Sequence, residues 1–211
     1  MDEILSVDFS STIGLIAMVL FTLNILMGLL ISVNYNPQTW WPHRKLPFPF
    51  WKLHNWNAYL ALSMAVLHPV ILLLSAQKGT PFRLVDVLYP VHSPHQTFYN
   101  NLGAITFYLF LFVVVTSYFR PQLRYRPWKK LHYTAYAAAA VMFIHGTLID
   151  PNLKDQPTDF LDGEKVLVEL CFLLVVAASV WRWKYGTEKQ RYLRMKAAEQ
   201  KRGGSREAAG V

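Results

Sequence analysis

Trp51–His68 (WKLHNWNAYLALSMAVLH) and Trp128–His145 (WKKLHYTAYAAAAVMFIH) are two related segments that decide the fold of this chain. Aligned without a gap, they share Trp, Lys, Ala, Tyr, Ala and His at matching positions. Each also carries an upstream histidine, His54 or His132, and continues as an apolar stretch. An ionisable side chain inside a membrane-spanning segment is costly, and such residues usually mark functional sites. Two matched pairs of histidines therefore predict a functional site shared by both segments.

The spacing of the histidines indicates the kind of site. Those of the first segment are 14 residues apart and those of the second are 13 apart, which at 1.5 Å of rise per helical residue is about 20 Å, too far to share one metal ion. If the helices run in parallel, His54 lies beside His132 near one membrane face. His68 then lies beside His145 near the other. Zinc needs about four ligands, whereas haem iron needs only one or two from the protein, so the pattern predicts two b-type haems.

One histidine, His132, is out of step with the repeat. At 3.6 residues per turn, 14 residues return to within about 40° of the same helix face, but 13 residues miss it by about 140°. The ungapped alignment places the odd residue between His132 and Ala135. We therefore expect His132 on the first turn of its helix or just before it, where the backbone can correct its direction.

Long apolar runs place the chain among membrane proteins. It has 211 residues, of which 53% are hydrophobic, and about 20 apolar residues are needed to cross about 30 Å of hydrocarbon. Five such runs predict an all-α, polytopic membrane helix bundle of five transmembrane helices: Ser11–Val33, Trp56–Ala76, Leu102–Phe119, Leu131–Ile149 and Val166–Trp183. Residues 1–183 then form a di-haem transmembrane domain, and residues 184–211 form a basic cytoplasmic tail. The single cysteine, Cys171, excludes an intrachain disulfide and a cysteine-based zinc or iron–sulfur site.

The basic residues predict the orientation. The formal net charge is +8, and 17 of the 21 Lys and Arg fall in the segments between spans one and two, between spans three and four, and from Arg182 onward. The opposite side holds mainly acidic residues. Because cytoplasmic loops carry the excess of Lys and Arg, the N-terminus is expected outside and the C-terminus in the cytoplasm, in a bacterial inner membrane.

Several residues keep two interpretations. His92 and His95, in the loop after span two, are close enough to share a metal, or are solvated loop residues. The small side chains from Ala137 to Ala140 leave room either for flat macrocycles or for close helix packing. Basic residues at the cytoplasmic mouth could pair with haem propionates or with lipid phosphates: Arg44, Lys45, Lys52, Arg126, Lys129 and Lys130.

The histidine pattern resembles the ferric-reductase-like transmembrane domain. WKKLH with a second histidine 13 residues on, preceded by a helix with histidines 14 apart, carries the resemblance, which covers roughly Arg44 to Trp183. The family includes ferric reductases, NADPH oxidases and the haem-bearing membrane subunit of the methionine sulfoxide reductase system. The resemblance implies an inner haem held by His54 and His132. It implies an outer haem held by His68 and His145, with electrons passing from the cytoplasm to an acceptor on the outer face.

The chain departs from its relatives at three points. The long reductases and oxidases continue into a flavin- and nicotinamide-binding domain, whereas here about 28 polar residues follow the last span and no G-x-G-x-x-G loop occurs. We therefore expect a separate cytoplasmic flavoprotein reductase or other donor. Leu72 stands where the oxidases place a further histidine, which argues against dedicated superoxide production. The methionine sulfoxide reductase subunit lacks a counterpart of His54, which distinguishes this chain from it.

The predicted function is that of a membrane oxidoreductase or electron-transfer subunit. Its expected partners are a donor, an outer acceptor and membrane lipid, with no nucleic acid. Two alternatives stay open: a quinone-linked cytochrome b subunit of a respiratory complex, and a haem-free polytopic scaffold or transporter in which the histidines only pack.

Overall fold

The computed structural model of the chain describes residues 3–33, 49–74, 83–89, 91, 96–150 and 159–209. Throughout these ranges the regular structure is helical, without a strand, which confirms the predicted all-α class. The helices are α1 (Glu3–Ser32), α3 (Phe50–Leu74), α4 (Leu84–Leu88), α5 (Thr97–Tyr118), α6 (Tyr125–His132), α7 (Thr134–Leu148) and α8 (Gly163–Ala209).

Within the described residues, four helices are long and apolar enough to cross a membrane: α1 over Asp8–Ser32, α3, α5, and α8 over Gly163–Glu188. They correspond to four of the five predicted spans. The remaining run, Leu131–Ile149, is divided between α6 and α7, and α7 has only 15 residues. At 1.5 Å per residue α7 alone is about 22 Å long, which is shorter than a bilayer core of about 30 Å. The helices thus support a multi-pass membrane protein, with α7 as a shorter helix of the bundle.

The division between α6 and α7 occurs at one residue, Tyr133. Its backbone N–H approaches the carbonyls of Lys129 and Lys130, both at 3.3 Å, and its own carbonyl accepts the N–H of Tyr136 at 3.1 Å. Bonds between residues three apart are typical of 3₁₀ geometry, which tightens a helix locally. Because the break follows His132 directly, it lies where the 13-residue spacing requires a change of direction.

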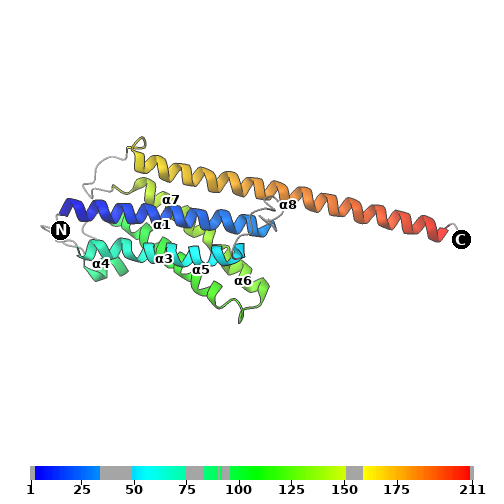
Figure 1. Cartoon of the computed structure of the whole chain (residues 1–211), viewed down its shortest axis with the longest axis horizontal. Helices are drawn as coiled ribbons and strands as arrows, with labels where there is room; N and C mark the ends of the chain where they lie inside the picture. Colours follow the sequence, from blue (N-terminus) through cyan, green and yellow to red (C-terminus); the bar gives the residue numbers. More distant parts are fainter. Residues whose placement is uncertain are drawn as a thin grey trace.

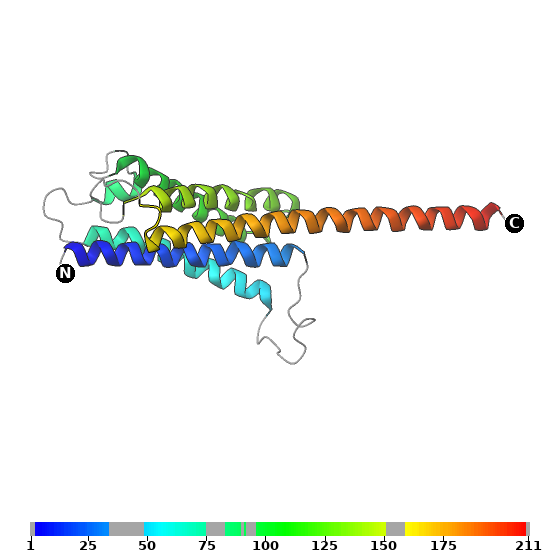
Figure 2. The ribbon, with the colours of Figure 1, turned by 90° about the horizontal axis from the view of Figure 1, so that it is seen from above.

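The bundle consists mainly of two helical hairpins, α1 with α3 and α5 with α7 (Figure 1). Helix α8 runs alongside α1 and also touches α7 (Figure 2). The helices that carry the histidines are α3 on one side and α6 and α7 on the other, and α3 makes little direct contact with either. A continuous apolar core joins α1, α3, α5, α7 and α8, and its largest members are Met18, Phe21, Phe110, Met142 and Phe143.

The outer surface of the bundle is apolar. Large hydrophobic side chains on α3, α5 and α8 are exposed, among them Leu60, Val66, Ile105, Phe112, Val115, Leu170, Leu173 and Leu174. A soluble protein rarely exposes so much contiguous apolar surface, whereas lipid tails accept it without cost.

Helix α8 extends well beyond the other helices toward the C-terminus (Figure 1). It runs as one helix through the predicted boundary between residues 183 and 184. The predicted basic tail therefore begins as a direct continuation of the last span.

Candidate functional site

The inner histidine pair comes from α3 and from the end of α6. The ring centres of His54 and His132 lie 6.3 Å apart, and their planes are inclined by 65°. Two imidazoles that bind opposite sides of one metal ion, each at about 2 Å, place their ring centres about 6 Å apart. The separation of the inner pair therefore fits axial ligation of one iron from two sides.

His132 is held by aromatic stacking on its own helix. The indole of Trp128, one turn earlier, lies 5.0 Å from the imidazole and nearly parallel to it, at 28°. The guanidinium of Arg120 lies over the same indole, 4.4 Å from its centre. Residues Arg120, Trp128 and His132 thus form a stack that leads from the basic end of the bundle to the inner pair.

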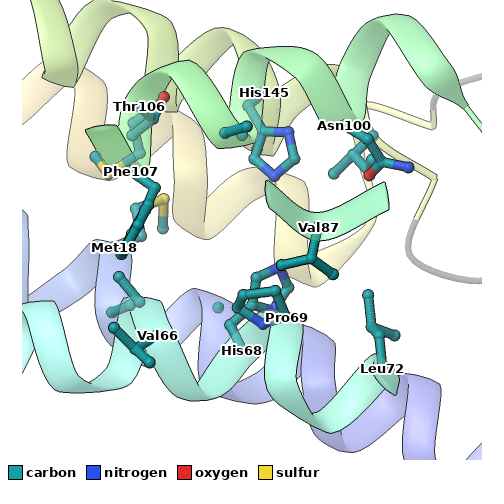
Figure 3. Close-up of a pocket in the computed structure, with 18 of the residues that line it drawn as sticks. Met18, Val66, His68, Pro69, Leu72, Val87, Asn100, Thr106, Phe107 and His145 are labelled. Atoms are coloured by element: carbon teal, nitrogen blue, oxygen red, sulfur yellow. The ribbon is translucent and has the colours of Figure 1, made fainter. Parts of the chain in front are cut away.

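The outer histidine pair lines one cavity of about 330 Å³. His68 from α3 and His145 from α7 point toward one another across it (Figure 3). The size is within the range of about 300–1,000 Å³ that small-molecule and cofactor sites occupy. Most of the lining is apolar, and it comes from six helices: α1, α3, α4, α5, α7 and α8. Met18, Val66, Phe107 and Met142 are among its apolar members.

The pairing establishes that α3 and α7 run in the same direction. His54 lies beside His132, while His68 and His145 share the other site, as the repeat predicts for parallel segments. Halfway between the histidines, the matching alanines Ala61 and Ala138 are both fully buried in the apolar core. These two alanines therefore contribute to close helix packing between the sites.

Three of the four imidazoles donate a hydrogen bond from Nδ1 to a backbone carbonyl. The acceptors are the carbonyls of Asn24 for His54 (3.1 Å), Ser10 for His68 (2.8 Å) and Tyr99 for His145 (2.8 Å). A carbonyl oxygen can only accept, so Nδ1 must carry the proton and Nε2 keeps the lone pair. Histidines that bind metals are typically oriented by such a bond from the second nitrogen.

The fourth imidazole has a different partner. Nδ1 of His132 lies 3.1 Å from the hydroxyl of Ser117 on α5, and a hydroxyl can either donate or accept. The sites accordingly offer two imidazole nitrogens each. Among the described residues, no three His, Cys, Asp or Glu side chains come together as a bare metal ion would require. This donor set fits a group such as haem, which brings its other four ligands with it.

A buried lysine that no sequence pattern indicated lies near the outer site. Lys165, at the start of α8, is only 4% exposed. Its ammonium donates hydrogen bonds to the carbonyl of Gly146, at 2.9 Å, and to that of Ile149. These carbonyls belong to the end of α7, where backbone acceptors have no partner within the helix, so Lys165 caps the helix that carries His145.

Two hydrogen bonds between Gln96 and Asp150 hold the start of α5 at the outer end of the bundle. The side chain of Gln96, just before α5, donates to the carbonyl of Asp150 at 3.2 Å and accepts its N–H at 2.8 Å. The pair joins the start of α5 to the chain after α7. It thereby ties together the ends of the two helices that carry Tyr99 and His145.

The other predicted candidates are placed as follows. Leu72 lines the outer cavity, one turn after His68 (Figure 3). Lys52 and Lys129 lie over the rings of Trp51 and Tyr125, both at 5.7 Å. Arg126 and Lys130 are exposed, and four candidates lie outside the described residues: Arg44, Lys45, His92 and His95.

Comparison with known proteins places these features in a family. No curated protein and no solved structure gave a significant match to the chain. The family described as the ferric reductase like transmembrane component matches residues 13–143, more than half of the chain. The match begins earlier than the predicted resemblance, within α1, and ends two residues before His145. The resemblance is confirmed, and the chain belongs to the ferric reductase-like transmembrane family.

Proposed function

We propose that this chain carries electrons across a membrane through two b-type haems, from a cytoplasmic donor to an acceptor on the outer face. Membership of the family indicates transmembrane electron transfer and oxidoreductase-type activity in general, and the family typically binds haem. The observation that supports two haems is the presence of two separate histidine pairs. His54 and His132 would hold the inner haem, and the other pair, His68 and His145, the outer one.

The protein's contribution is to hold and orient the ligands. Haem, when bound, supplies a one-electron change of its iron. Carbonyl hydrogen bonds keep three imidazoles with Nε2 available as a ligand. Because two histidines would hold each haem, the arrangement favours electron transfer without binding of substrate to the iron. The outer cavity is lined mainly by apolar side chains, with Asp86, Glu164 and Lys165 among the charged ones.

The proposed donor is a separate flavoprotein reductase. Five cations and no acid occur between Phe119 and Leu131, at the end of the bundle next to the inner pair. Such a surface speeds encounter with an acidic partner more than it strengthens binding. The stacked residues Arg120 and Trp128 lie between this surface and His132. The donor loses one electron for each electron that the outer acceptor gains.

In the proposed orientation the C-terminus lies in the cytoplasm of a bacterial cell and the N-terminus lies outside. The proposed acceptor would then approach the outer end of the cavity. Leu72 lines this end and provides no imidazole one turn beyond His68. Residue 72 therefore provides no histidine that could interact with oxygen, which favours an acceptor other than oxygen.

Haem content tests the proposal. Purified wild-type chain should show a b-type spectrum and about two haems per chain, and His68→Ala should retain about one, because losing an axial ligand affects its own site first. Ser63→Ala is the control and should retain about two, because Ser63 is an exposed residue of α3 whose hydroxyl bonds to the carbonyl of Tyr59. Reduction should require an added flavoprotein. A colourless wild-type protein would refute the proposal in favour of a haem-free scaffold or transporter, and rapid reduction by a quinol would favour the cytochrome b alternative.

A further inference from the structure

Two glycines lie directly against the imidazoles of the outer pair. A Cβ atom on Gly14 of α1 would be 2.9 Å from Nδ1 of His68. A Cβ atom on Gly103 of α5 would likewise be 2.9 Å from Cε1 of His145. Non-bonded carbon atoms prefer about 3.5–4.0 Å, so at both positions any side chain would displace the imidazole or the helix.

In the inner pair, one of the two imidazoles, that of His54, also lies against a glycine. A Cβ atom on Gly28 of α1 would be 3.3 Å from Cε1 of His54, which is tight but less severe. At the fourth position α5 has Ser117, whose hydroxyl contacts His132. Three of the four histidines are thus packed against a glycine of a helix that provides no histidine itself.

Each glycine follows, by four residues, the carbonyl that accepts the hydrogen bond of the same histidine. The pairs of carbonyl and glycine are Ser10 and Gly14, Asn24 and Gly28, and Tyr99 and Gly103. In an α-helix the Cα–Cβ bond is tilted toward the N-terminus, so a side chain covers the preceding turn of its own face. A side chain four residues after the carbonyl would therefore occupy the space through which the imidazole reaches it.

The spacing of these contacts repeats along the helices. Gly14 and Gly28 are 14 residues apart on α1, which equals the separation of His54 and His68 on α3. Since α1 and α3 are antiparallel neighbours, equal spacing brings both contacts into register at once. On α5 the same interval leads from Gly103 to Ser117. The hairpins α1–α3 and α5–α7 therefore repeat one arrangement.

We infer that Gly14, Gly28 and Gly103 are positioning residues for the haem ligands. Each leaves open the carbonyl that orients its imidazole, so that α1 and α5 set the direction of ligands carried by the neighbouring helices. The inference rests on the proposed function and extends it to residues that touch no iron. It assigns Gly14 and Gly103 to the outer site and Gly28 to the inner one.

Single alanine substitutions test the assignment. Gly14→Ala and Gly103→Ala should lower the haem content from about two to about one per chain, because the Nδ1 hydrogen bond cannot form without displacement of the ring. Gly28→Ala, with its longer contact, should keep both haems but shift the midpoint potential and the low-spin electron paramagnetic resonance signal of the inner one. The control is Gly163→Ala, whose Cβ would have nothing within 4 Å and which should leave both haems and their potentials unchanged.

The retained inner haem reports whether the variants fold. A Gly14→Ala or Gly103→Ala chain with about two haems and unchanged potentials would overturn the inference, as would loss of both haems or an equal loss in the Gly163→Ala control. A wild-type chain without haem would overturn the proposed function itself. The two failures are therefore distinguishable in one set of preparations.

Discussion

Lys165→Met should destabilise the bundle by about 2 kcal/mol. Methionine preserves the length and most of the apolar volume of the side chain, so the change removes mainly the ammonium group. The ammonium donates to the carbonyls of Gly146 and Ile149, and hydrogen bonds from charged groups contribute about 1.5–3 kcal/mol each. The cost of burying one charge, of several kcal/mol, offsets a large part of this gain. Lys165→Met also leaves two carbonyls without these partners, at a cost of about 1–3 kcal/mol for each buried group. This cost makes the net change in the free energy of unfolding a destabilisation.

The assay is thermal unfolding in detergent at one scan rate. For a chain of this size 1 kcal/mol corresponds to about 2–4 °C, so the midpoint should fall by about 4–8 °C. The control is Lys184→Met, an exposed lysine on the same helix, which should shift the midpoint by no more than about 1 °C. A Lys165→Met midpoint equal to that of the wild type would show that desolvation cancels the hydrogen bonds and would refute the reasoning.

Two further predictions concern the inner site. Trp128→Leu removes the ring stacked on His132 and should weaken inner-haem retention by about 2- to 12-fold, as expected from about 0.5–1.5 kcal/mol for an aromatic pair; haem release to apomyoglobin measures it, and an unchanged rate would contradict a role for the stack. Ser117→Ala removes the partner of His132 Nδ1 and should weaken the same haem about fivefold, at about 1 kcal/mol for one hydrogen bond. Its control is Thr116→Val, since Thr116 bonds only to carbonyls of its own helix; equal effects of the two substitutions would count against Ser117 as a specific partner.

The pairing of the four histidines could be predicted because both pairs lie within one repeated sequence segment. Rise per residue and an ungapped overlay were enough to pair His54 with His132 and to anticipate a change of direction beside His132. The division at Tyr133 was harder to predict, because a hydropathy window merges α7 with the residues before it. The structure shortens that predicted span to the 15 residues of α7.

The orienting carbonyls and glycines could not be predicted from the same reasoning. The interval of 14 between Gly14 and Gly28 is visible in the sequence, but it acquires meaning only when α1 is known to lie antiparallel to α3. The role of Lys165 could not be predicted from the sequence for a related reason. Its partners are backbone carbonyls of α7, and no side-chain pattern indicates a backbone acceptor.

The small contact between α3 and α7 has a consequence for biogenesis. Each histidine pair takes one member from the first half of the polypeptide and one from the second, so neither pair exists until the ribosome has delivered both. If the cofactors bind as proposed, retention of the inner one requires a chain that has reached α6, and retention of the outer one a chain that has reached α7. A chain released before α6 would have lone imidazoles only, and quality-control proteases would find it open between its two halves.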